Sequence, residues 1–362
     1  MIILIYFFSP IFFVPIIVLI LLVFSIITSN KIAFLQRKIF YLTILLVLVS
    51  LLMIITNLQI GKEIVELYKW TSISLLILFF QNERAETFLY AFQIYSILSF
   101  IMIIIQQFFP DNDLVLQIAS YYAAHDLIVE NFVKGHVRST GFNEGPGHVG
   151  VLISFNLLII YLKFKWGIIL KGYKFLGALF SLVSIVVTAA KGALPIFIIL
   201  NKRFSIISFG LFLVFFFSVF SIDDIFYFER LTHSESGEAR VDIWTSLINM
   251  SISEPLTFLF GNARVDEVAS ISIFDSDWIY IFFTKGILGV SILLIVLLHL
   301  SLKLQWSKSS FFFLLIIFIL IGFANPAFTD IKFGLIYFYL LISLSYIRIK
   351  NKNHIINSTI IQ

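Results

Sequence analysis

The chain has 362 residues, of which 60% are hydrophobic and 13% are charged, and its mean hydropathy is +1.03. Because soluble domains carry about 25% charged residues, this composition excludes an ordinary soluble protein. The absence of cysteine excludes disulfides and thiolate metal sites, and a net charge of +4 gives no indication of nucleic-acid binding. We expect an all-α, polytopic integral membrane protein that forms one domain over residues 1–362.

Hydropathy divides the chain into apolar runs that approach the roughly 20 residues needed to cross a bilayer. These runs predict about eleven transmembrane helices, within a range of about 10–12. The expected spans are 2–28, 39–56, 68–81, 87–108, 148–163, 173–190, 191–203, 204–221, 277–300, 310–325 and 332–349.

Basic residues in short loops indicate which helix ends face the cytoplasm. Most of the 25 basic residues fall in one set of connections: Lys31, Arg37, Lys38, Arg84, Lys163, Lys165, Lys171, Lys174, Lys202, Arg203, Lys303, Lys308, Arg348, Lys350 and Lys352. We therefore expect a multi-pass protein of the bacterial inner membrane, with these connections and the C-terminus cytoplasmic and the N-terminus periplasmic.

The stretch from Lys174 to Lys202 is short for two crossings. At about 1.5 Å per residue it reaches roughly 40 Å, whereas two crossings of the hydrocarbon core need about 60 Å. A single crossing would place the later basic loops outside, against the charge rule. The sequence thus predicts a hairpin of short or tilted helices, with Lys191 at its outer turn. Lys191 is a functional candidate at membrane depth, or a lysine that extends to the interface.

Two long polar segments, 109–147 and 222–276, lie on the periplasmic side in this topology. Segments of this length in a compact protein usually carry function. The first ends in "RSTGFNEGPGHVG", where Gly145-Pro146-Gly147 precedes an expected helix from about His148. The N–H groups at that helix start favour an anion, and the guanidinium of Arg138 suits phosphate oxygens. A surface turn with a solvated arginine is the plainer alternative.

The second segment contains an expected amphipathic helix that lies along the membrane surface. Ser236 is its expected N-cap, and Arg240 lies one turn before Trp244. One helical face is expected to hold Val241, Trp244, Leu247, Ile248 and Ser251. Because the segment is otherwise acidic, an ion pair with a neighbouring carboxylate is the plainer role for Arg240.

Asp275 and Asp277 stand where the chain re-enters the membrane. Asp275 is a candidate proton acceptor at the interface, and a helix N-cap is its plainer role. Both Asp275-Ser276-Asp277 and Asp111-Asn112-Asp113 have the D-x-D form that holds a metal in many glycosyltransferases, although the pattern also arises by chance. The histidines His125, His136 and His233 lack metal-ligand spacing, and His148 is a stronger candidate for chemistry.

Several of these pieces, taken in chain order, resemble the O-antigen polymerase (Wzy-type) group, which belongs with the O-antigen ligases. The matching pieces span about 138–289 and comprise Arg138-Gly141-Glu144-Gly147, Lys191-Gly192-Ala193, Arg240 with Trp244, Gly261, and Asp275-Ser276 with Gly286 and Gly289. Each motif alone is loose, but their order and shared side of the membrane make the match fairly specific.

The resemblance implies a polymerase that transfers a glycan from undecaprenyl diphosphate onto a lipid-linked repeat unit. Arg138, Arg240 and Lys191 would bind the diphosphates, and the proton acceptor would be Asp275, with Glu144 or His148 as alternatives. Expected partners are the lipid-linked donor and acceptor, membrane lipid and a chain-length regulator protein. No cofactor, metal or nucleic acid is expected.

Two positions depart from the family pattern. Ala190-Lys191 stands where Ser-Arg is usual, which weakens bidentate phosphate binding there, and Asp275 stands where ligases carry histidine. The second departure favours a polymerase over a ligase that transfers polysaccharide to the lipid A core. The sequence is also compatible with a metal-dependent glycosyltransferase using Asp111 and Asp113, a flippase for lipid-linked oligosaccharides, or a scaffold without chemistry.

Overall fold

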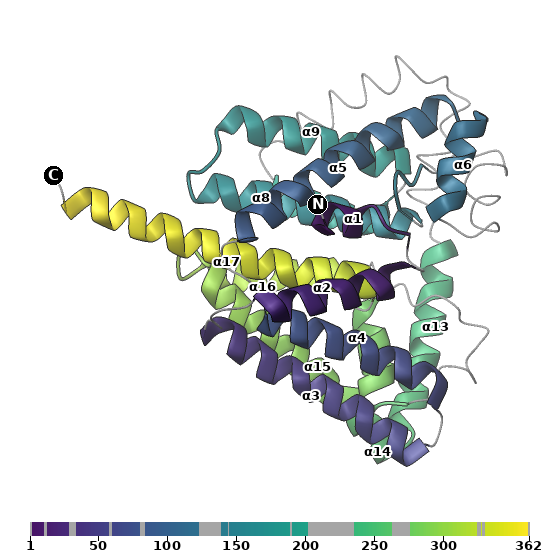
Figure 1. Cartoon of the computed structure of the whole chain (residues 1–362). Helices are drawn as coiled ribbons and strands as arrows, with labels where there is room; N and C mark the ends of the chain where they lie inside the picture. Colours follow the sequence, from purple (N-terminus) through teal and green to yellow (C-terminus); the bar gives the residue numbers. More distant parts are fainter. Residues whose placement is uncertain are drawn as a thin grey trace.

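The described part of the protein is predominantly helical in the computed structural model (Figure 1). The described residues are 2–10, 13–28, 34–57, 60–79, 84–122, 139–143, 145–188, 190–201, 235–262, 276–323, 327 and 330–360. No strand occurs among them, in agreement with the expected all-α class.

Five described helices are long and apolar enough to cross a membrane, judged by length and composition. They lie within α5 (Ala85–Phe108), α8 (Pro146–Lys165), α9 (Lys171–Thr188), α15 (Asp277–Leu304) and α17 (Ile331–Ile360). Two shorter apolar helices lie in α2 (Val14–Thr28) and α16 (Ser310–Phe323), and α3 (Phe34–Asn57) and α4 (Ile60–Leu78) are further long helices. The helical membrane character is therefore supported, whereas the total of about eleven spans stays a prediction.

Helix α17 is the central element of the bundle. It contacts α5 and α8 on one side and α4 and α15 on the other (Figure 1). Its inward residues Ile336, Tyr337 and Phe338 are fully buried, as expected of a helix surrounded by other helices.

The first apolar run does not form one helix, so the predicted span 2–28 is wrong as a single element. The chain forms α1 (Ile2–Phe7), turns at Ser9 and Pro10, and continues as α2 (Val14–Thr28). Proline lacks a backbone N–H and clashes with the preceding turn of a helix, which explains the break. Helix α1 then packs against α5, while α2 packs against α4 and α17.

In the expected hairpin at 173–203, the helix ends close to the turn predicted at Lys191. Helix α9 ends at Thr188, a 3₁₀ turn η4 covers Lys191–Ala193, and α10 (Leu194–Leu200) follows. Helix α10 contacts α8 and α16. Its seven residues extend only about 10 Å. The predicted second limb of the hairpin, 191–203, is described only as far as Asn201, and the next predicted span, 204–221, lies outside the described residues, so both crossings stay predictions.

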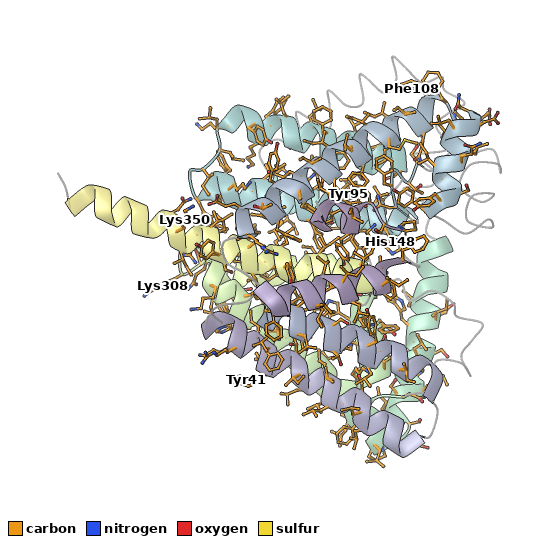
Figure 2. All side chains as sticks on the ribbon, in the orientation of Figure 1. Tyr41, Tyr95, Phe108, His148, Lys308 and Lys350 are labelled. Atoms are coloured by element: carbon orange, nitrogen blue, oxygen red, sulfur yellow. The ribbon has the colours of Figure 1, made fainter. Side chains whose placement is uncertain are left out.

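The basic connections gather at one end of the bundle. Lys350 pairs with Glu86 at 2.7 Å, and Arg348 donates to the carbonyl of Lys303. Figure 2 labels Lys308 and Lys350 at this end and His148 toward the opposite end. Lys303, Lys308, Arg348 and Lys350 therefore lie together as predicted, whereas Lys31, Lys202 and Arg203 lie outside the described residues. The assignment of this end to the cytoplasmic side of the membrane stays a prediction.

Helix α13 (Glu235–Ile252) runs across the opposite end of the bundle (Figure 1). Leu247 packs against Phe283 of α15, and the rings of Trp244 and Phe323 meet at 5.7 Å. Leu247 and Ser251 are buried and Trp244 and Ile248 partly so, as the helical face predicted.

Two details of the α13 prediction are wrong. Val241 is 56% exposed and therefore does not belong to the buried face of α13. Ser236 is not the N-cap, since the helix already begins at Glu235. Helix assignments commonly shift by one or two residues at their ends.

Candidate functional site

The structure describes the six predicted site residues to different extents. His148 is described in full, in the first turn of α8. Lys191 lies in η4 and Arg240 in α13, and only their backbones are described. Arg138, Glu144 and Asp275 lie outside the described residues, so their roles stay predictions.

The polar stretch before α8 is anchored to the bundle. The side-chain oxygen of Gln106 in α5 accepts the N–H groups of Thr140 and Gly141, each at 2.8 Å. Gly141 has φ +62°, and a β-carbon there would lie 2.8 Å from the Ser99 carbonyl. The Tyr95 hydroxyl donates to Oδ1 of Asn143 at 2.7 Å. Residues 139–143 therefore form a fixed, buried turn and not a surface turn, whereas the environment of Arg138 lies outside the described residues.

The first turn of α8 meets the first turn of α17. His148 Nε2 lies 4.0 Å from Oδ2 of Asp330, and its ring stacks on Phe333 with 5.1 Å between the ring centres. A small cavity of about 10 Å³ adjoins this contact and is lined by Ser9, Tyr122, Phe142, Asn143, His148, Lys332 and Phe333. That volume is close to the minimum for one water molecule.

Tyr122, the last residue of α6 (Asp113–Tyr122), is one of the residues that line this cavity. Burial and the neighbouring Tyr121 raise the pKa of Tyr122 to about 12, so its hydroxyl stays protonated at neutral pH. That hydroxyl donates to the carbonyl of Phe8 at 2.8 Å and thus ties α6 to the turn after α1.

Asp277 joins α15 to the segment that precedes α17. Its carboxylate is fully buried and accepts the N–H of Ala327 at 2.6 Å. Asp330 follows Ala327 by three residues and accepts the Phe333 N–H at 2.8 Å, as a helix N-cap does. The starts of α8, α15 and α17 are therefore connected at this end of the bundle.

The other D-x-D pair has a simple structural role. Asn112 accepts the N–H of Leu114 at 3.0 Å and stabilises the start of α6, while Asp111 and Asp113 are exposed. Within the described part of the chain, no group of three or more histidine, aspartate or glutamate side chains is arranged to hold a metal ion.

Two of the motif segments contact each other at a bend in α15. Gly286 interrupts the helix with φ +63° and ψ −166°. A β-carbon on Gly286 would lie 2.6 Å from the nitrogen of Gly261, which follows α14 (Pro255–Phe260) and has φ +91°. The Asn262 N–H donates to the Phe283 carbonyl at 2.6 Å. The bend is therefore built by direct packing of "LFGN" against "TKG".

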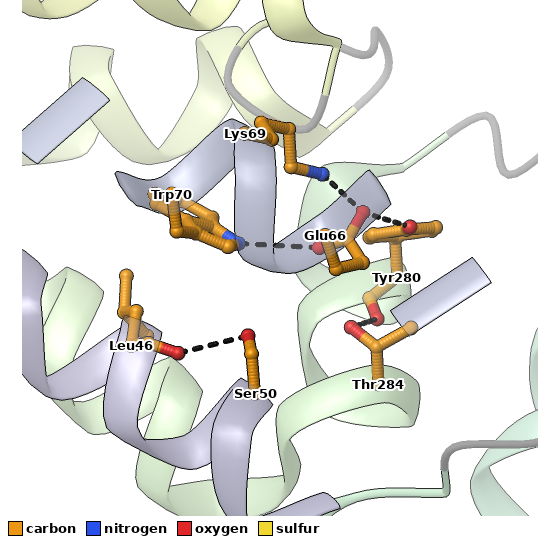
Figure 3. Close-up of polar contacts among 7 residues, drawn as sticks. All are labelled: Leu46, Ser50, Glu66, Lys69, Trp70, Tyr280 and Thr284. Atoms are coloured by element: carbon orange, nitrogen blue, oxygen red, sulfur yellow. Dashed lines mark hydrogen bonds and ion pairs between the residues drawn. The ribbon is translucent and has the colours of Figure 1, made fainter. Parts of the chain in front are cut away.

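A buried charged cluster adjoins this bend, and the sequence-based prediction missed it (Figure 3). Glu66 accepts hydrogen bonds from Lys69, from Trp70 at 3.2 Å and from the Tyr280 hydroxyl at 2.5 Å. The Lys69 ammonium also lies 5.0 Å from the centre of the Tyr280 ring. Lys285, next to Gly286, is only 2% exposed.

A sequence signal for this cluster did exist. Glu66, Lys69 and Trp70 have the i, i+3, i+4 spacing that places side chains on one helical face. The predicted span began at residue 68, and Glu66 therefore fell in the preceding loop. Extending that run by two residues, to Glu66, would have marked an ionisable pair at membrane depth.

No protein-family model matches the chain, and no curated protein or solved structure matches it. The functional argument therefore rests on the chain's own residues and their arrangement.

Proposed function

We propose that this protein is a glycosyltransferase that polymerises lipid-diphosphate-linked oligosaccharide repeat units. The observation that carries the proposal is the contact between Gly261 and Gly286 at the bend of α15. These glycines belong to separate motif segments of the O-antigen polymerase-like pattern. The starts of α8 and α15, which bear two further segments of that pattern, lie at the same end of the bundle.

The proposed reaction forms one bond and breaks one bond. A hydroxyl oxygen of the acceptor repeat unit attacks the anomeric carbon of the donor glycan, and the bond from that carbon to the lipid diphosphate breaks. The diphosphate leaves with the bonding electrons, so cations near it lower the barrier. A nearby base must take the hydroxyl proton.

Arg138 and Arg240 are the proposed diphosphate-binding residues, with Lys191 as a third cation. Arg240 belongs to α13, whose later turns pack on α15 and α16 through Leu247 and Trp244. The packing of α13 across this end of the bundle is consistent with substrate binding at the membrane surface. Guanidinium groups suit this role because their planar fork matches phosphate oxygens.

The proposed substrates are a glycan on undecaprenyl diphosphate and a single repeat unit on a second carrier. We propose that the reaction takes place at the periplasmic face of the inner membrane, because the basic connections gather at the opposite end. A chain-length regulator protein is a further proposed partner. No cofactor enters the proposed reaction.

The test is deletion of the protein followed by electrophoresis of the surface polysaccharide. The proposal expects the ladder to disappear while one repeat unit remains on the lipid core, and complementation should restore the ladder. Complete loss of polysaccharide from the core would instead indicate a ligase or a flippase. An unchanged ladder would reject all three functions.

A further inference from the structure

His148 and Asp330 form a pair of ionisable side chains that is separate from the residues proposed to bind phosphate. His148 lies in the first turn of α8 and Asp330 lies at the N-cap of α17, with His148 Nε2 and Asp330 Oδ2 4.0 Å apart. The two side chains are 16% and 10% exposed. Their mutual electrostatic interaction is therefore stronger than between groups in bulk water.

Phe333 holds both members of the pair. Its backbone N–H donates to Oδ1 of Asp330 at 2.8 Å, which fixes the carboxylate. Its ring lies nearly parallel to the imidazole of His148, with an interplanar angle of 9° and 5.1 Å between the ring centres. Phe333 thus fixes the relative position of the imidazole and the carboxylate before any substrate binds. Such preorganisation favours catalysis.

The surroundings of the imidazole are polar. His148 lines the small cavity together with Ser9, Asn143 and Lys332. The turn that contains Asn143 leads directly into α8, and Gln106 anchors it through Thr140. An imidazole that served only as packing would need neither a carboxylate nor a polar cavity beside it.

We propose that His148 accepts the proton of the attacking acceptor hydroxyl, and that Asp330 is the positioning residue that stabilises the resulting imidazolium. This inference rests on the proposed polymerase function. The oxygen–carbon bond forms as the carbon–phosphate oxygen bond breaks. The hydroxyl proton moves to a ring nitrogen of His148, and the lipid diphosphate departs with the electron pair. Histidine suits the task because imidazole is the side chain most often used as a general base.

Substitution of Asp330 by asparagine distinguishes its helix-capping role from its electrostatic role beside His148. It caps helices about as well as aspartate, so Asp330→Asn retains the start of α17 but removes the negative charge. Asp113→Asn is the matched control, because Asp113 begins α6 at the same end of the bundle and is exposed. His148→Gln removes the base while keeping a polar side chain.

The experiment measures chain extension by the purified full-length protein with lipid-linked repeat units, as kcat and KM. We expect His148→Gln to lower kcat by roughly 10²-fold or more, the usual contribution of a general base. Asp330→Asn should lower kcat by at least about tenfold with little change in KM. The double variant should be no slower than His148→Gln alone, because Asp330 acts through His148. Asp113→Asn should match the wild type.

Three results would overturn the assignment. They are wild-type kcat in His148→Gln, wild-type kcat in Asp330→Asn, and a double variant slowed by the product of the single effects. A purely structural contact would lower the yield or thermal midpoint of Asp330→Asn and leave the kcat of the folded fraction unchanged. If the wild-type protein itself extends no chain, the proposed function fails. If the wild type extends chains normally but the variants do so too, only the His148–Asp330 inference fails.

Discussion

Gly261 and Gly286 pack backbone against backbone at the bend of α15, although 25 positions separate them in the sequence. Both have positive φ, at +91° and +63°. A β-carbon on Gly286 would come within 2.6 Å of the Gly261 nitrogen. The short helix α14 is thereby locked against the point where α15 bends, next to the buried Lys285.

Alanine at either glycine should disrupt this bend. The positive φ angles disfavour a side chain, and the added methyl group would displace backbone atoms, at a cost of about 1–3 kcal/mol for each change. We expect Gly261→Ala and Gly286→Ala to shorten or abolish the polysaccharide ladder and to lower the thermal midpoint in detergent. Gly172→Ala is the control, because nothing lies within 4 Å of its β-carbon position. Wild-type behaviour of Gly286→Ala would show that the bend is dispensable.

The buried Glu66 carboxylate should contribute strongly to stability. Glu66→Gln removes the negative charge beside the 3% exposed Lys69. Breaking a buried ion pair on one side costs about 3–5 kcal/mol. We expect a thermal midpoint lower by roughly 5–10 °C, with substantial recovery in Glu66→Gln/Lys69→Met. The contrasting pair Glu86 and Lys350 is about 60% exposed, so Glu86→Gln should hardly change the midpoint. Equal shifts from both glutamates would contradict this account.

Membrane sidedness can be tested directly because the chain contains no cysteine. Ser253 follows α13 and Ser307 follows α15, and both are exposed at opposite ends of the bundle. In intact inner-membrane vesicles of known orientation, an impermeant maleimide should label Ser253→Cys only from the periplasmic side. It should label Ser307→Cys only from the cytoplasmic side. The reverse labelling would exclude the proposed periplasmic reaction.

The proposed phosphate contacts predict a strong effect of the two arginines. Losing a charged hydrogen bond in a desolvated site costs several kcal/mol, or roughly 10²–10³ in rate. Arg138→Ala and Arg240→Ala should each abolish chain extension at unchanged protein level, and lysine should restore little because it lacks the planar fork. Arg37→Ala, an exposed arginine at the opposite end, is the control. Full ladders from both alanine variants would show that these arginines are surface charges that do not bind substrate phosphates.

The sequence predicted the helices that depend on long apolar runs. The runs at 87–108, 148–163 and 277–300 correspond to α5, α8 and α15, because hydropathy over about 20 residues is a strong local signal. The turn after α1 was missed although Pro10 marked it, since the surrounding run exceeded the length of one crossing. At this position the helix-breaking effect of Pro10 outweighed the apolar character of the run.

The contacts that assemble the site could not be predicted in the same way. Asp277 meets Ala327 across 50 positions, and His148 meets Asp330 across a still larger separation. Such pairs depend on which helices pack side by side, and neither periodicity nor local spacing contains that information. The motifs marked Gly261 and Gly286 individually, and only the packing of α14 on α15 explains why both are glycines.

The His148 assignment also predicts the behaviour of Asp275, the residue that the family resemblance favours as the proton acceptor. Asp275 precedes α15 by two positions, beside the Ser276 N-cap residue. If His148 is the base, Asp275→Asn should retain most of the ladder, because asparagine keeps the hydrogen-bonding capacity of aspartate near a helix start. If Asp275 is the base, asparagine should fail as completely as alanine, and glutamate should retain partial activity. Asp275→Asn and His148→Gln should be compared in the same strain. If His148 is the base, only His148→Gln loses the ladder, and if Asp275 is the base, only Asp275→Asn loses it. Loss of extension in Asp275→Asn together with a normal ladder in His148→Gln would transfer the proton-accepting role to Asp275.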